Sequence, residues 1–182
     1  MERMGRMFNK KVVPLILLLI LILLLVFFLP IKQTFTFTEQ RTDHPKRFFL
    51  PLTNVDEFQI RYVHSIHLTD VVETYAVTDV DKIRLLSMTY ENLGIGLPGY
   101  AAEGETMTLA DGMYTLTYDD KVIEEFTLFI GSVDAELAFR YDGNEIDLKK
   151  HFDKGKSYIF CLTKLSIYQM LRGEDLNVKR NK

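Results

Sequence analysis

The chain has 182 residues, a formal net charge of −3 at pH 7 and one cysteine. This length corresponds to one domain once a targeting segment is set aside, and the lone Cys161 excludes an intrachain disulfide framework. The first eleven residues carry a formal charge of +3, so the rest of the chain carries −6. That balance argues against a nucleic-acid-binding protein.

A long apolar run near the N-terminus predicts a membrane anchor. VVPLILLLILILLLVFFL, residues 12–29, contains eighteen residues without a charge. A helix of that length spans about 27 Å, which is close to the thickness of the hydrocarbon core of a bilayer. Four basic residues precede the run, so the positive-inside rule places residues 1–11 in the cytoplasm. We expect a transmembrane signal anchor over residues 12–30 and an extracytoplasmic β-domain over residues 31–182.

A cleaved secretory signal peptide is the competing interpretation of this run. The apolar core of a signal peptide is about 7–15 residues long and a small-x-small cleavage site follows it. Here the run is longer, and the following PIKQTFTF contains no such site. The uncleaved anchor in the cytoplasmic membrane is therefore favoured, and Pro30 to Lys32 would be a short linker that keeps the domain near the bilayer.

Beyond the anchor, apolar and polar residues alternate with a period of two, the pattern of half-buried β-strands. The expected strands are TFTFT (34–38), FQIRYVHS (58–65), VVETYAV (71–77), KIRLLSMTY (82–90), TMTLA (106–110), MYTLTYD (113–119), VIEEFTLFI (122–130), ELAFRY (136–141), NEIDL (144–148) and SYIFCLTKL (157–165). Roughly nine or ten short strands predict an all-β fold, an antiparallel sandwich or a partly closed barrel. DLKKHF is expected to form a helical turn, SIYQML either a helix or more strand, and Cys161 is expected to be buried.

The stretch RYVHSIHLTDVVETY, residues 61–75, is unusually polar for two strands. A two-residue turn at positions 68 and 69 would set three cross-strand pairs, Tyr62 with Tyr75, His64 with Glu73, and His67 with Asp70. Side chains two positions apart share a face of a strand, so Tyr62, His64, Glu73 and Tyr75 would lie on one polar face of this hairpin. The face could be an exposed ion pair, a ligand or partner contact, or a catalytic or metal site.

Catalysis and metal binding are the weakest of these interpretations. His64 and His67 are three positions apart, so in a regular strand their rings point to opposite faces and converge only at a bend. No fixed third ligand is evident elsewhere. Ser65 adjoins His64, but neighbouring strand residues face opposite ways, so the two do not form a catalytic pair. We predict no metal, no cofactor and no catalytic residue.

A second candidate is the loop ENLGIGLPGYAAEGE, residues 91–105, which contains four glycines and a proline. It lacks the Lys-Ser or Lys-Thr of a phosphate-binding loop, and a strand rather than a helix follows it. It is either a broad turn between sheets or a loop over a pocket, with the carboxylates of Glu91, Glu103 and Glu105 at the rim. We expect it to begin beside His64, because sequential strands usually neighbour each other.

These motifs resemble, in their order, the bacterial family called domain of unknown function 1850. The resemblance rests on His64-Ser65, Glu73, Gly94-x-Gly96, NEIDL and SYIFCL, and it covers roughly residues 58–171. It implies a small membrane-anchored or exported β-protein, often encoded beside TRAP transporters of the TAXI type. Those transporters move organic anions with a permease and an extracytoplasmic solute-binding protein. The family implies no activity for the motif residues, and His67 lies outside its pattern.

Two functions follow from these observations. The first is a membrane-anchored accessory protein that contacts a transporter permease or its solute-binding protein. The alternative is a small-ligand-binding protein or an enzyme that uses the His64–Glu73 face and the loop over residues 94–104. For both, the candidate binding residues are Tyr62, His64, Ser65, Glu73, Tyr75, Gly94, Gly96 and Glu103.

Overall fold

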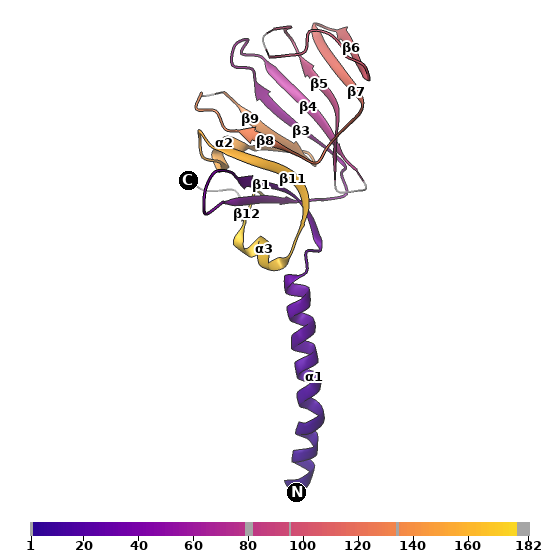
Figure 1. Cartoon of the computed structure of the whole chain (residues 1–182), viewed down its shortest axis with the longest axis vertical. Coiled ribbons are helices and arrows are strands. Elements are labelled where there is room, and N and C mark those ends of the chain that lie inside the picture. Colours follow the sequence, from indigo (N-terminus) through magenta and orange to yellow (C-terminus); the bar gives the residue numbers. More distant parts are fainter. Residues whose placement is uncertain (1, 79–81, 95, 134, 178–182) are drawn as a thin grey trace.

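The computed structural model describes residues 2–78, 82–94, 96–133 and 135–177. Its first element is the helix α1 (Glu2–Phe28), which projects from one end of a β-domain (Figure 1). Within the described ranges, no helix combines the length and the apolar character that a membrane-crossing segment requires. The strands that follow are β1 (Lys32–Glu39), β2 (Arg47–Pro51), β3 (Glu57–Val63), β4 (Asp70–Val77), β5 (Ile83–Tyr90), β6 (Glu105–Ala110), β7 (Met113–Ile123), β8 (Glu125–Phe129), β9 (Leu137–Tyr141), β10 (Asn144–Asp147), β11 (Ser157–Leu165) and β12 (Glu174–Asp175).

The strands form two open sheets. The sheet nearer α1, here called the proximal sheet, has the order β12-β2-β1-β11-β8. The other, here called the distal sheet, has the order β10-β9-β3-β4-β5-β7-β6. Pairing is antiparallel throughout, except that β12 runs parallel to β2. The all-β fold is confirmed as a two-sheet sandwich, and the alternative of a partly closed barrel is wrong for the strands described.

Aromatic rings hold the two sheets together. Phe160 of β11 in the proximal sheet is fully buried, and its ring centroid lies 5.4 Å from that of Phe58 and 5.8 Å from that of Phe139 in the distal sheet. Within its own sheet the same ring lies 4.8 Å from Phe37 and 4.9 Å from Phe126. Such tilted contacts add to the large apolar area that these rings bury.

Alternation along β11 follows the sequence prediction, but one burial prediction was wrong. Tyr158, Phe160 and Leu162 are buried between the sheets. Cys161 lies on the opposite face of the strand and is only half-buried. Its Sγ lies 3.2 Å from Oγ1 of Thr36 on β1. A cysteine inside an apolar run is therefore not in the core, because every second side chain of a strand points away from the partner sheet.

Three local features differ from the predicted elements. The strands β2 and β12 were not expected, and residues 122–130 do not form one strand. β7 ends at Ile123 in the distal sheet, and β8 begins at Glu125 in the proximal sheet, so the chain changes sheets at Glu124. The open question about SIYQML is settled as the helix α3 (Ile167–Arg172), which Ser166 caps with its side chain through a capping box. Such a box satisfies two backbone N–H groups at the helix start.

The helical turn expected in DLKKHF is confirmed as α2 (Leu148–His151). The side chain of Asp147 accepts a hydrogen bond from Lys149 N at 3.0 Å and so begins the helix. Aspartate is among the preferred residues at this position.

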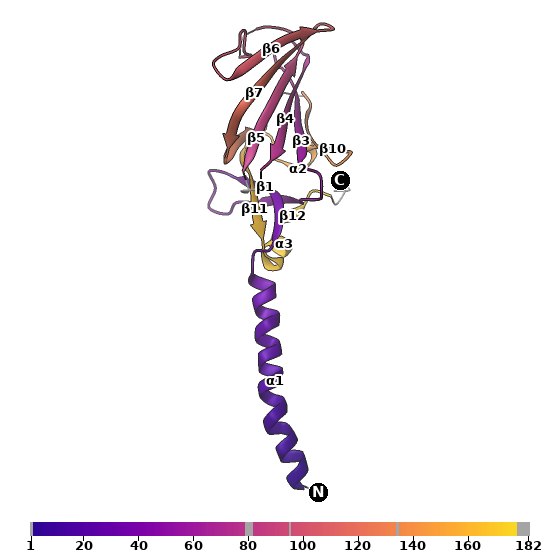
Figure 2. The same ribbon diagram turned by 90° about the vertical axis from the view of Figure 1, so that its right-hand side faces the viewer.

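The elements follow one another along the long axis of the molecule. α1 lies at one end, α3 and the proximal sheet come next, and the turns of the distal sheet beside β6 form the far end (Figure 1). Figure 2, turned by a right angle, shows the same order. The polar residues picked out in the sequence therefore lie in the sheet farther from α1.

Removing the ring of Phe160 should destabilise the domain strongly. Because Phe160 touches aromatic rings of both sheets, Phe160→Ala should lower the free energy of unfolding by about 3–5 kcal/mol. Thermal and denaturant unfolding of the full chain in detergent, followed by circular dichroism, measures this. The matched control is Phe129→Ala, since Phe129 is 61 % exposed on β8 and should change stability by less than about 0.5 kcal/mol. Equal losses in both variants would contradict the central place of Phe160.

Candidate functional site

The β3–β4 hairpin carries the polar stretch in a register different from the predicted one. Val63 pairs with Asp70 and Ile60 pairs with Glu73, so the connection spans residues 64–69. The prediction that His64 faces Glu73, and likewise the pairs of Tyr62 with Tyr75 and His67 with Asp70, was wrong. The turn is wider because Leu68 adopts a φ of 56° and because His64 N donates to Thr69 O at 2.9 Å.

The predicted shared face survives for three of the four residues. The register shift is an even number of positions, and an even shift leaves each strand side chain on its original face. Tyr62, Glu73 and Tyr75 therefore lie on the inner side of the distal sheet, the side of the buried Ile60. The Tyr75 hydroxyl donates a hydrogen bond of 2.6 Å to Oε2 of Glu73. This sheet face thus turns from aromatic core to polar cluster at Tyr75.

Glu73 is a half-buried carboxyl whose protonation depends on its surroundings. Burial raises its pKa above the ordinary 4.5, while the hydrogen bond from Tyr75 and the Lys121 ammonium lower it. Burial also raises the pKa of Tyr62 and Tyr75, and the nearby charge of Glu73 adds to both shifts. Glu73 can therefore accept a hydrogen bond when ionised and donate one when protonated, and the phenols stay protonated donors.

Two further members of this cluster, Tyr118 and Lys121 on β7, were not predicted from the sequence. Burial, followed by the charges of Glu105 and Glu73, raises the pKa of Tyr118 to about 12. The ammonium of Lys121 lies 4.4 Å from the centroid of the Tyr118 ring. Tyr118 is two positions from the apolar Leu116 in MYTLTYD, and this spacing indicates that the two side chains share the inward face of the strand. Its proximity to Glu73 depends on β5 lying between β4 and β7, which no local pattern shows.

The expected closeness of His64 to the glycine-rich loop is confirmed. A Cβ added to Gly96 would lie 3.9 Å from Nε2 of His64. A Cβ added to Gly94 would overlap Nε2 of His67, so the loop backbone passes directly against that ring. The Tyr90 hydroxyl donates 2.6 Å to the carbonyl of Pro98 and ties the loop to β5. A larger residue at position 94 would therefore require the His67 imidazole to move.

The two histidines lie together at the turn. Their ring centroids are 5.1 Å apart at an interplanar angle of 23°, and Nδ1 of His64 accepts a hydrogen bond from His67 N at 3.3 Å. The two rings converge because both residues lie in the β3–β4 turn and not in a regular strand. Among the described residues, no group of three or more side chains is suited to hold a metal ion. The structure leaves Ser65 and Glu103 exposed, and no described contact draws them into the cluster.

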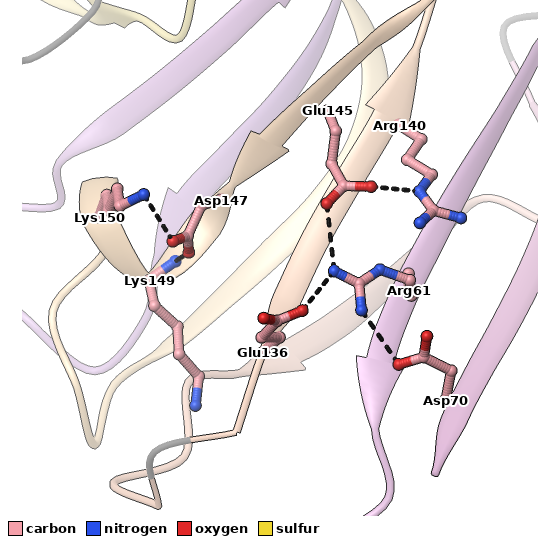
Figure 3. A network of polar contacts seen from close by, with 8 residues as sticks. All are labelled: Arg61, Asp70, Glu136, Arg140, Glu145, Asp147, Lys149 and Lys150. Atoms are coloured by element: carbon pink, nitrogen blue, oxygen red, sulfur yellow. Dashed lines mark hydrogen bonds and ion pairs between the residues drawn. The ribbon is translucent and has the colours of Figure 1, made fainter.

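The outer side of the distal sheet carries an ion-pair network that was not predicted (Figure 3). Arg61 of β3 is 8 % exposed. Its guanidinium lies 3.0 Å from Asp70, 2.5 Å from Glu136 and 3.1 Å from Glu145. The Glu136 hydrogen bond is the main reason that the pKa of Arg61 is raised. The network links β3 to β4, β10 and the segment before β9, directly behind the Glu73 cluster, and so fixes the backbone that carries it.

A groove of about 670 Å³ also opens on this outer side. Its lining includes Gln59 and Thr74, which bond each other at 3.2 Å, and Arg140 and Glu145, which form an ion pair at 2.5 Å. These polar groups already satisfy one another. The Glu73 cluster, where burial perturbs several titratable groups at once, is therefore the stronger candidate site.

The fold and the site together define an all-β sandwich domain whose distal sheet carries a half-buried carboxyl–tyrosine cluster. The chain belongs to the family described as domain of unknown function (DUF1850), whose model matches residues 58–148. The match runs from β3 through β10 and covers the distal sheet except for Glu57, the first residue of β3. It confirms the family expected from the motifs, over a shorter range than residues 58–171. No curated protein and no solved structure matches the chain significantly.

The burial of Glu73 predicts a pH-dependent stability. Because the folded-state pKa is raised above 4.5, the folded protein binds this proton more tightly than the unfolded chain. The resulting stabilisation is complete below pH 4.5 and is lost as the pH rises through the folded pKa. Glu73→Gln cannot ionise, so its stability relative to wild type should increase between about pH 4 and about pH 8. Melting temperatures across this range measure the difference.

The matched control for this measurement is Glu103→Gln, an exposed carboxyl on the glycine-rich loop. It should change the stability by less than about 0.5 kcal/mol at either pH. A Glu73→Gln variant whose advantage over wild type is independent of pH would show that the carboxyl is not desolvated in the folded protein.

The contact between Gly94 and His67 predicts a coupled pair of substitutions. Gly94→Ala should cost about 1–3 kcal/mol of stability, because the new methyl group overlaps the imidazole. In a His67→Ala background the same change should cost clearly less, and a double-mutant cycle measures the coupling. Gly99→Ala is the control, since a Cβ there meets nothing within 4 Å. Purely additive losses at positions 67 and 94 would rule out the packing contact.

Proposed function

We propose that the protein is a single-pass accessory protein of the cytoplasmic membrane, with its β-domain outside and its distal sheet presented to a partner. The observation that carries this proposal is the surface of α1. From Val13 to Phe28 its exposed large apolar side chains are 45–66 % accessible. Soluble monomeric proteins rarely expose a continuous apolar surface of this kind. Although no described helix has the length and apolar character of a membrane-crossing segment, the uncharged run over residues 12–29 of the sequence is close in length to a bilayer core. The basic residues before it favour a cytoplasmic N-terminus.

The partner that we propose is a transporter permease or its solute-binding protein, of the TAXI-type TRAP class that the family resemblance implies. Apolar side chains at the distal end support a protein contact. Ile66 and Leu68 in the β3–β4 turn are 58 % and 72 % exposed, Tyr100 in the glycine-rich loop is 80 % exposed, and Leu109 of β6 is 60 % exposed. The strand registers bring these connections to one end of the sheet, next to the family-matched polar cluster. Exposed apolar groups gathered in this way are typical of interaction surfaces.

A second candidate is a small-ligand-binding protein, and the specific observation in its favour is the Glu73 cluster. A carboxyl of raised pKa flanked by Tyr62, Tyr75 and Tyr118 offers several hydrogen-bonding groups at a half-buried position. Such a set suits a small polar ligand, because buried polar groups with fixed directions give orientation and specificity.

One experiment separates the two candidates. The detergent-solubilised full chain should co-purify a multi-span permease or a solute-binding protein from its native membranes. Ile66→Asp combined with Leu68→Asp should abolish that association while the fold, checked by circular dichroism, persists. Val122→Asp is the control, since Val122 is 46 % exposed on β7 but lies at the opposite end of the sheet. A small molecule that co-purifies in place of a protein, and is lost in Glu73→Gln, would favour the second candidate.

A further inference from the structure

We infer that α3 and the groove beside it form a second membrane contact, which binds the headgroups of anionic phospholipids. This inference rests on the proposed membrane anchor. It concerns the end of the domain opposite the Glu73 cluster, and neither the family match nor the motifs of the sequence include it.

The first observation is that α3 is held against the end of α1. The ring centroid of Tyr168 lies 6.0 Å from that of Phe27 and 5.2 Å from that of Phe28. Ser166 fixes the start of α3 at the end of β11 through its capping box. α3 therefore lies where α1 leaves the domain (Figures 1 and 2). If α1 crosses the bilayer, α3 lies at the level of the membrane–water interface.

The second observation is the exposure of apolar side chains at this level. Leu171 is 73 % exposed and Ile167 is 36 % exposed, although both belong to a helix that packs on the domain. Phe28 and Ile31, at the end of α1 and just beyond it, are 54 % and 62 % exposed. These residues continue the apolar surface of α1 onto α3. Short apolar helix faces with an adjacent tyrosine are suited to the interfacial region of a bilayer.

The third observation is a cationic groove next to this apolar surface. It has a volume of about 410 Å³, and its charged and polar lining includes Lys46, Arg47, Tyr168, Gln169, Arg172 and Glu174. Three of these are cations and one is an acid. The guanidinium of Arg172 bonds the Tyr168 hydroxyl at 2.9 Å, which positions it at the groove beside the end of α1. Lys46 is engaged by Asp153 at 3.0 Å, so the two arginines are the principal phosphate-binding groups.

These observations together select an anionic phospholipid as the occupant. A guanidinium presents planar donors that match phosphate oxygens, and basic residues close to a bilayer are attracted by anionic lipids. The apolar residues of α3 would lie among the acyl chains while Arg47 and Arg172 bind headgroups. Two attachments, α1 and α3, would then hold the domain upright and set the height of the distal sheet above the membrane.

The test uses the full chain with nitroxide labels at single cysteines, in a Cys161→Ser background, reconstituted into vesicles. Labels are placed at Leu21→Cys in α1, Leu171→Cys in α3 and Leu109→Cys on β6. Collision rates with oxygen, which concentrates in the bilayer, and with a water-soluble nickel chelate report the depth of each label. We expect bilayer-like values at positions 21 and 171 and a water-like value at position 109.

The outcomes separate this inference from the proposed anchor. A water-like label at position 171 with a bilayer-like label at position 21 overturns the α3 contact and leaves the anchor intact. A water-like label at position 21 overturns the anchor itself, and the inference falls with it.

A second arm tests the lipid chemistry. With the label at position 171, vesicles of phosphatidylcholine alone are compared with vesicles that also contain phosphatidylglycerol. Phosphatidylglycerol should deepen the label, and Arg47→Gln combined with Arg172→Gln should remove that deepening. Arg84→Gln is the control, because Arg84 is an exposed cation on β5 of the distal sheet. Equal depth in both lipids, or deepening that persists in the double variant, overturns the headgroup contact.

Discussion

The packing of Phe160 against the distal sheet is the interaction on which the arrangement of this molecule depends. The β-domain has two open sheets, and each has one face that must be buried. The rings of Phe35, Phe58, Phe139 and Phe160 fill the space between them. Tyr75 continues this stack, since its ring lies parallel to that of Phe58 at 5.0 Å, but its hydroxyl leaves the apolar region and bonds Glu73. One side chain thus joins the stabilising core to the candidate site.

How far the sequence predicts this structure can be judged from particular strands. TFTFT and SYIFCL alternate so regularly that the sequence predicts which of their side chains are buried. The same alternation correctly predicted that Tyr62, Glu73 and Tyr75 lie on one side of the sheet. The cross-strand partners could not be predicted in this way, because a shift of the register by an even number of residues changes the partners and leaves every side chain on the same face. The register was set by the width of the β3–β4 turn, which depends on the positive φ of Leu68. Leucine is not a residue from which such a backbone angle is expected.

Other features depended on contacts between segments that are distant in the chain. Arg61 in FQIRYVHS gives no local sign of its role, since its partner Glu136 is 75 residues away. Tyr118 meets the Glu73 cluster only because β7 lies beside β5. The strand β2 was obscured by its run of three buried residues, Phe48, Phe49 and Leu50, which shows no alternation. In each case the missing information was tertiary and not a property of the local pattern.

The order of the elements explains how one chain separates the end that carries α1 from the far end of the distal sheet. Every strand of the distal sheet lies within residues 57–147, whereas the proximal sheet combines β1 and β2 with β11 and β12 from the other end of the sequence. β1 pairs with β11 along its whole length, from Lys32 with Leu165 to Glu39 with Tyr158. The segment that follows α1 is thereby fixed to the segment that leads into α3. The chain crosses between the sheets at Glu124 and then adds β8 beside β11. The distal sheet is therefore free to carry polar and exposed groups at its far end, because its other end packs into an aromatic core to which both sheets contribute.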